Sequence, residues 1–115
     1  MNIFFYKANK SSVVEFIKSL DAKDRATVLA CLKSVEELGL DSPRVAFRQI
    51  KGKLWEIKIK ATGAGYRIFY VVVQKNSLVL LHAYKKQTQK APIKELMVAE
   101  KRMLEVMTHE NTYIN

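Results

Sequence analysis

Basic and amide side chains gather in three stretches of the chain that each form or leave a predicted strand. Lys58 and Lys60 alternate with apolar residues in LWEIKIK, and Arg67 lies among large apolar residues in GYRIFY. The third group follows the last apolar run and consists of Lys85, Lys86, Gln87, Thr88 and Lys90. Fixed cations aimed at one point stabilise negative charge on a phosphate. If the strands are neighbours, these residues predict a positive groove with the guanidinium of Arg67 in its floor.

Several of these residues also have a structural interpretation. Lys58 and Lys60 can form an ordinary solvated strand face. Arg67 can pair with Glu56 on the neighbouring strand, because a charge among apolar side chains needs a partner. His82 is a candidate catalytic residue, although a histidine in an apolar strand is more often packed or bonded to the backbone.

Tyrosine side chains recur in the two strands that carry or follow Arg67. Tyr66, Tyr70 and Tyr84 could stack on nucleic-acid bases. Tyrosines at strand spacing are more typical of packing, and that interpretation is preferred here.

The net charge of +9 is concentrated in the middle of the chain. Residues 43–94 hold twelve basic side chains against one acidic side chain, Glu56, whereas residues 1–42 hold six of each. Such a concentration predicts a surface that faces a polyanion. Nucleic acid is the first candidate, followed by an acidic protein partner or anionic lipid, and a merely solubilising surface is the alternative.

The length of 115 residues predicts one domain over residues 1–115. No apolar run approaches the roughly 20 residues that a membrane helix needs, and the N-terminus lacks a signal-peptide pattern. We therefore expect a soluble, cytoplasmic protein with no membrane partner. The single Cys31 excludes an internal disulfide, and no Cys/His spacing suggests a metal site, so we expect neither a metal nor a cofactor.

Three helices are predicted from apolar spacing and capping signals. The first is SSVVEFIKSL, in which Ser12 and Glu15 form a capping box. The second begins after Asp21 and ends at Gly39, which can supply a left-handed stop. The third begins at Pro92. Its predicted apolar face consists of Ile93, Leu96, Ala99, Met103 and Met107; the methionines near the C-terminus are interpreted as core residues, and THENTYIN as a frayed tail.

Strand periodicity occurs in NIFFYK and in the stretches VAFRQIKGKLWEIKI, YRIFYVVV and SLVLLHAY. In LWEIKIK the apolar Trp55, Ile57 and Ile59 share one face, and the intervening charged residues share the other. The order of elements predicts an α+β domain, with an antiparallel sheet and helices packed on one face. The basic side chains would then lie on the face that the helices leave uncovered.

The segments LWEIKIKATGAGYRIFYVVV and VLLHAYKKQTQKAPIKELMVAEKRM together resemble the HigB branch of the RelE-like toxins of bacterial and phage toxin–antitoxin systems. The shared pattern is a tryptophan-led strand, an aromatic-Arg-apolar-aromatic strand, and a strand that ends in lysines, a threonine and a proline before a helix. The resemblance covers roughly residues 44–105. It implies a RelE-like fold in which two N-terminal helices and a C-terminal helix pack on a small sheet.

The resemblance also implies an activity and partners. The activity is that of a metal-independent endoribonuclease, an mRNA interferase that cleaves mRNA in the ribosomal A site and inhibits translation. The implied partners are the ribosome with its mRNA and a HigA-like helix-turn-helix antitoxin. The toxin–antitoxin complex could bind operator DNA through the antitoxin.

The same resemblance implies roles for individual residues. Arg67 would hold the scissile phosphate, Lys58 would be a phosphate ligand or the base, and Lys86 or Lys85 would steady the phosphate or the leaving oxygen. Contacts to RNA would come from Lys60, Gln87, Thr88 and Lys90. Some relatives carry a second basic residue two positions before Lys58, where this chain has Glu56, which could be a general base or could hold Arg67 in place.

Two other functions are compatible with the sequence. A ParE-type toxin shares this fold but poisons DNA gyrase and needs no RNA-cleaving groups, so Arg67 and the lysine cluster would be unusual in it. A non-catalytic RNA- or ribosome-binding protein would keep a salt-dependent affinity without cleavage.

Overall fold

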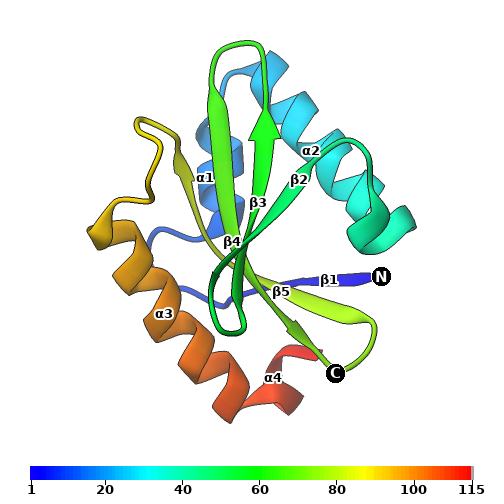
Figure 1. Cartoon of the computed structure of the whole chain (residues 1–115), viewed down its shortest axis with the longest axis vertical. Helices are drawn as coiled ribbons and strands as arrows, with labels where there is room; N and C mark the ends of the chain where they lie inside the picture. Colours follow the sequence, from blue (N-terminus) through cyan, green and yellow to red (C-terminus); the bar gives the residue numbers. More distant parts are fainter. Residues whose placement is uncertain (115) are drawn as a thin grey trace.

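The computed structural model describes residues 1–114, which form a five-stranded sheet with helices on both faces (Figure 1). The strands are β1 (Asn2–Phe5), β2 (Ala46–Lys51), β3 (Leu54–Lys60), β4 (Gly65–Val73) and β5 (Ser77–Lys85). The helices are α1 (Val13–Ser19), α2 (Ala22–Leu38), the 3₁₀ helix η1 (Gly39–Asp41), α3 (Ile93–Thr108) and α4 (Glu110–Ile114). The predicted α+β class is confirmed.

The strand order across the sheet is β1-β5-β4-β3-β2. Strands β2 to β5 are sequential antiparallel neighbours, because short turns join each strand to the next. Strand β1 instead pairs parallel with β5, so the sheet is mixed rather than wholly antiparallel. This pairing brings the N-terminal strand beside the last strand of the sheet, although most of the chain separates them in sequence.

Each face of the sheet carries its own apolar core. On one face α1 and α2 cover a cluster that includes Val28, Val35 and Ile57. On the other face α3 and α4 cover a cluster that includes Phe69 and Val106. The expectation that all helices pack on one face is therefore wrong. Strands β4 and β5 are apolar on both sides, and burying both sides requires helices on both faces.

The predicted helix ends are confirmed. Ser12 and Asp21 each accept a hydrogen bond from the backbone N–H three residues further on, at 3.0 and 2.9 Å. Gly39 ends α2 with φ of +64°, a conformation that glycine adopts without the clash of a Cβ atom. Helix α3 follows Pro92 directly.

The predicted apolar face of α3 is only partly buried. Ala99 is fully buried and Met103 packs against the core, whereas Ile93 and Met107 are exposed. Met97 is exposed as well, so two of the three methionines of this helix are not the core residues that the sequence suggested. The sheet buries only the side of the helix that faces it, and the apolar residues of α3 extend beyond that side.

The C-terminal residues up to 114 are ordered as helix α4 rather than frayed, in contrast to the interpretation of THENTYIN. Tyr113 is buried, and its ring stacks on that of Tyr6 with a centroid separation of 5.7 Å. The final residue of that segment, Asn115, lies outside the described residues. Among residues 1–114, no helix is both long enough and apolar enough to span a membrane.

The turn between β3 and β4 is fastened to the N-terminal part of α2, which lies beside it in Figure 1. Asp24 Oδ1 accepts a hydrogen bond from Gly63 N at 3.1 Å, and its Oδ2 accepts one from the Tyr66 hydroxyl at 2.6 Å. A Cβ atom at Gly63 would lie 2.7 Å from Asp24 Oδ2, so a side chain there would displace the carboxylate. This anchor holds the hairpin that carries the predicted basic residues.

The anchor also shifts the acidity of both side chains. The hydrogen bond from Tyr66, followed by that from Gly63 N, lowers the pKa of Asp24 below its ordinary value, because both bonds favour the ionised carboxylate. The same bond to Asp24, together with burial, raises the pKa of Tyr66 to about 12.

Candidate functional site

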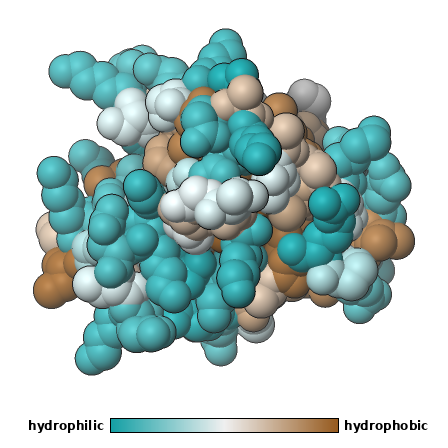
Figure 2. All heavy atoms as spheres, turned by 90° about the horizontal axis from the view of Figure 1, so that it is seen from above, coloured by the Kyte–Doolittle hydropathy of each residue, from teal (hydrophilic) through white to brown (hydrophobic). Residues whose placement is uncertain are grey.

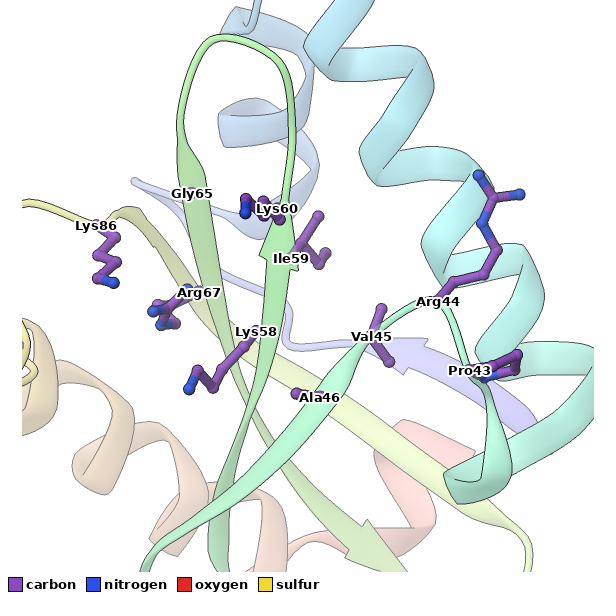
Figure 3. A pocket seen from close by; sticks show the side chains of 10 residues that line it. All are labelled: Pro43, Arg44, Val45, Ala46, Lys58, Ile59, Lys60, Gly65, Arg67 and Lys86. Carbon is purple, nitrogen blue, oxygen red and sulfur yellow. The ribbon is translucent and has the colours of Figure 1, made fainter.

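Four of the predicted site residues line one groove of about 580 Å³. They are Lys58, Lys60, Arg67 and Lys86, and the remaining lining comes from residues 43–46, Ile59 and Gly65. Figure 3 shows the side chains of Lys58, Arg67 and Lys86 extending on the same side of the sheet. They come from β3, β4 and the segment that follows β5, so sequential pairing of the strands brings the three cations together.

The strand register explains this convergence. Lys58 lies directly opposite Arg67, and side chains of opposite residues in an antiparallel pair point to the same face. Gly65 lies on that face two residues before Arg67 and leaves the floor of the groove open. A Cβ atom there would lie 3.7 Å from Arg67 Nη1 and 3.6 Å from Lys86 Cδ. The two cations therefore flank one small area of backbone.

The groove lies on the face of the sheet that carries α3, and not on a face without helices. Lys58 and Arg67 point to the same side as Leu54 and Phe69, which belong to the core under α3. Figure 3 draws α3 below the groove residues. The helix covers one end of this face, and the cations occupy the end that it leaves open.

The surface at the hairpin end of the molecule is largely hydrophilic, as the view from above in Figure 2 shows. The groove lining contains the cations Arg44, Lys58, Lys60, Arg67 and Lys86, and among the described residues no carboxylate contributes to it. No three His, Cys, Asp or Glu side chains within residues 1–114 are grouped to hold a metal ion. The chemistry that this groove offers is the binding of anions.

Glu56 is fully buried behind the groove. Its Oε1 lies 2.6 Å from Arg48 Nη2 and 3.6 Å from Arg67 Nε, and its Oε2 accepts a hydrogen bond from the Tyr84 hydroxyl at 3.4 Å. The ion pair between Arg67 and Glu56 is therefore present. A carboxylate with no exposed surface and two adjacent guanidinium groups is suited to position Arg67, and it cannot reach a substrate proton without rearrangement.

Arg67 itself is held at both ends of its guanidinium. Its Nε faces Glu56, and its Nη1 donates a hydrogen bond to the backbone oxygen of Tyr66 at 3.2 Å. The residue is 7% exposed, and that exposed part belongs to the groove. This arrangement limits the rotamers of Arg67 and directs the rest of its guanidinium toward the groove.

The tyrosines pack inside the protein. Tyr66, Tyr70 and Tyr84 are at most 7% exposed, which supports the packing interpretation over base stacking. Burial, with the nearby charge of Glu56, raises the pKa of Tyr84 to about 12, so its hydroxyl remains protonated and can donate to that carboxylate at neutral pH.

The other residues of the predicted lysine cluster lie outside the groove. Lys85 and Gln87 line a neighbouring hollow together with His82. Thr88 Oγ1 donates a hydrogen bond to the backbone oxygen of Lys90 at 2.8 Å, which shapes the exposed loop after β5. The cluster is thus divided between Lys86, which reaches the groove, and an exposed rim formed by the other members.

His82 is packed away from the groove. Its Nε2 lies 2.8 Å from Glu95 Oε1, and because the carboxylate accepts, the ring nitrogen donates. The ring also stacks on Phe69 at a centroid separation of 6.5 Å, and Nδ1 has no hydrogen-bond partner within residues 1–114. The structure therefore places His82 as a link between β5 and α3, beside Lys85 but away from the cations that line the groove.

Three residues around the groove are absent from the sequence-based prediction. Arg44 lines the groove and Arg48 pairs with Glu56, while Gly65 opens β4 although the sequence pattern assigns it to a turn. The sequence contains a signal for Arg48. The strands on either side of Gly52 form a hairpin, and counting four residues in each direction reaches Arg48 and Glu56, which are partners in the observed register.

Comparison with known proteins yields one family. The family model described as "Phage derived protein Gp49-like (DUF891)" matches residues 15–104. The matched range extends from α1 into α3 and includes every residue that lines the groove. The search of curated proteins found no match.

Proposed function

The chain belongs to the Gp49-like family of phage-derived proteins, a toxin-like family of the RelE/HigB type, and from this premise we propose that it is a toxin that cleaves mRNA in the ribosomal A site. The observation that carries the proposal is the convergence of Lys58, Arg67 and Lys86 in one groove without a facing carboxylate among the described residues. Such a groove suits the phosphodiester backbone of RNA.

The proposed reaction uses the RNA's own 2′-hydroxyl as the nucleophile. Its oxygen attacks the adjacent phosphorus, the bond from phosphorus to the 5′-oxygen breaks, and a proton passes to that leaving oxygen. The intermediate phosphorane carries additional negative charge, which fixed cations stabilise without a metal. Arg67 is assigned to this charge, since Glu56 and the Tyr66 carbonyl hold its guanidinium in place before substrate binds.

The lysines of the groove have complementary assignments. Lys58, directly opposite Arg67, would bind the phosphate or accept the proton of the 2′-hydroxyl. Lys86, across Gly65 from Arg67, would steady the phosphate or the leaving oxygen. Lys60, at the outer end of β3, would contact the RNA backbone beside the scissile bond.

The exposed rim is assigned to docking on the ribosome. Lys85, Gln87, Thr88 and Lys90 lie in or beside the loop after β5, where they can reach phosphates with little geometric constraint. The partner that neutralises the toxin would be a HigA-like helix-turn-helix antitoxin, and the complex would bind operator DNA through that antitoxin.

A second candidate function is non-catalytic binding to RNA or to the ribosome. It is favoured by one observation, namely that Glu56 and His82 are both buried and engaged, and the described groove lining contains no imidazole or carboxylate for proton transfer. Under this alternative the cations bind RNA and translation stops because the A site is occupied.

The deciding experiment is induction of the protein in cells that lack an antitoxin, followed by mapping of mRNA ends. We expect growth arrest and new mRNA ends inside codons, and in a purified system these ends should form only when ribosomes are present. Intact mRNA during arrest would contradict cleavage and favour the binding protein. A supercoiling assay on DNA gyrase tests the ParE-type activity, and we expect no inhibition.

A further inference from the structure

Helix α3 presents a row of large apolar side chains to solvent. Ile93, Met97, Leu104 and Met107 are 75%, 66%, 63% and 36% exposed. Their spacing places them on one side of the helix, because residues three, four, seven and eleven apart recur on the same face. We refer to these four residues as the α3 stripe. Glu100 lies on the same side of the helix between Met97 and Leu104, so the row carries one carboxylate near its centre. Single exposed apolar residues are ordinary, but four on one helix face are typical of an interaction surface.

A hollow adjoins the stripe on the side of the β2–β3 hairpin. It has a volume of about 270 Å³, and its apolar lining consists of Leu54, Met103, Leu104 and Met107. Methionine side chains are flexible and polarisable, so such a surface can adapt to an inserted side chain. A convex apolar surface, such as the face of a helix, could therefore place one residue in the hollow and others along the stripe.

Lysines border the stripe on both sides. Lys51 and Lys53 of the β2–β3 hairpin lie at the hollow, and Lys94 and Lys101 lie on α3 beside the stripe. All four are exposed, and none forms an ion pair with a carboxylate of residues 1–114. Among the described residues, Glu100 is the only acidic one in the lining of the hollow. The four lysines outnumber this one carboxylate, so the surface around the apolar row is net positive.

We propose that the α3 stripe binds an acidic amphipathic helix of a partner protein. Apolar side chains of that helix would contact the stripe and the hollow, and carboxylates on its two flanks would face the lysines. The inference deepens the proposed function and rests on it for the partner's class, since it names the surface and the chemistry that would hold an antitoxin segment. The stripe shares no residue with the cationic groove, so this contact alone would not fill the groove.

Two other occupants fit the stripe less well. A second copy of the chain would bring the same lysines from both copies together across a two-fold interface, which opposes association in a protein of net charge +9. An anionic membrane surface would satisfy the lysines but would leave the concave hollow without a complementary side chain. Both occupants are distinguished by the experiment.

The experiment follows methyl signals of methionine in the full chain. The four methionines are Met1, Met97, Met103 and Met107; three lie on α3, and Met1 packs against the core on the opposite face of the sheet and serves as an internal reference. The probe is a synthetic helical peptide as long as α3, with leucine at heptad positions a and d and glutamate on both flanks. A peptide with lysine in place of glutamate and vesicles of anionic lipid are the comparison probes.

We expect the acidic peptide to shift the Met97 and Met107 signals and to leave Met1 unchanged. Leu104→Glu should weaken this binding by at least about ten-fold, as expected for a central apolar anchor. Leu29→Glu is the matched control, because Leu29 is a similarly exposed leucine on α2, and it should bind the peptide as the parent does. Lys53→Glu should weaken binding and reduce its dependence on salt.

Several results would overturn the proposal. Undiminished binding to Leu104→Glu would place the peptide elsewhere, and equal binding of the lysine peptide would exclude charge recognition. Shifts of Met97 and Met107 that appear with vesicles alone, or with rising protein concentration alone, would identify a membrane or a second copy as the occupant. The measurement uses neither ribosomes nor RNA. Its failure therefore leaves mRNA cleavage untouched, and loss of cleavage leaves the binding result standing.

Discussion

Glu56 and Asp24 are both buried carboxylates, but Glu56 is paired with cations, whereas Asp24 accepts hydrogen bonds from neutral groups. Glu56 lies between the guanidinium groups of Arg48 and Arg67, on the α3 face of the sheet. Asp24 accepts hydrogen bonds from neutral donors, the Tyr66 hydroxyl and the Gly63 N–H, on the face of α1 and α2. One carboxylate fixes a cation that points into the groove, and the other fixes the backbone turn of the hairpin that carries it.

The two arrangements together explain how a cationic groove can be held in position. A cation that projects among apolar neighbours requires a counter-charge, and Glu56 supplies it from below without occupying the groove. A turn needs only that its N–H be satisfied, and a carboxylate on a packed helix does this without introducing a further cation. Changes at the two carboxylates should therefore have different consequences for chemistry, for stability and for pH dependence.

The largest expected effect concerns the cation itself. Arg67→Ala removes the guanidinium aimed at the phosphorane, and by analogy with oxyanion donors this should cost roughly 2.7–4 kcal/mol, or about 100- to 1000-fold in the cleavage step. Ribosome binding should change little. The measurement is single-turnover mRNA cleavage on programmed ribosomes, with thermal unfolding as the control for folding. A folded Arg67→Ala variant that cleaves at the parental rate would remove Arg67 from the active site.

The second-largest effect is expected at Glu56, the carboxylate that pairs with Arg67. Glu56→Gln keeps the shape of the side chain but leaves two guanidinium groups without their counter-charge. Because the Arg48 side chain is 40% exposed and water offsets part of the loss, we expect destabilisation near the lower end for broken buried pairs, about 3 kcal/mol. Denaturant unfolding measures it, and the cleavage rate of the folded fraction should also fall. A variant as stable as the parent would contradict the structural role of Glu56.

The contribution of the Asp24 anchor to stability should decrease at acidic pH. The pKa of Asp24 is lowered in the folded state, so its contribution to stability is present above its ordinary pKa of 3.8 and is lost as the pH falls through the lowered value. Asp24→Asn cannot titrate and should show a weaker loss of melting temperature on acidification than the parent does. Parallel pH profiles for the two proteins would mean that ionisation of Asp24 adds no stability to the folded state.

The smallest effect belongs to the exposed rim, where no carboxylate of residues 1–114 forms an ion pair with Lys85 or Lys90. Lys90→Ala should weaken ribosome association to a similar extent whatever the mRNA sequence. It should also reduce the slope of log affinity against log salt by about one. Single-turnover cleavage at saturating ribosome should remain nearly parental. An Arg67-like loss of cleavage in Lys90→Ala would mean that the rim takes part in the chemistry, and the contrast between rim and groove would fail.

Local patterns in the sequence carry much of this architecture. Ser12, Asp21, Gly39 and Pro92 mark helix ends that the structure confirms, because capping depends on a few neighbouring backbone groups. The alternation in β3 places Lys58 and Lys60 opposite Ile57 and Ile59, since successive side chains point to opposite faces. The α+β class and the sequential pairing of β2 to β5 follow from the order and spacing of these segments.

Other properties depend on contacts between segments that are distant in the chain. Only the packed fold shows that helices cover both faces, that β1 lies parallel to β5, and that His82 faces Glu95 rather than the groove. Apolar periodicity does not determine which part of an apolar face is buried against another element. The exposure of Met97 and Met107 therefore could not be predicted from their spacing. Local sequence patterns thus indicate which residues carry charge and on which strand face they lie. Which of these residues come together depends on the strand register and on how far α3 covers the sheet, and both are properties of the packed fold.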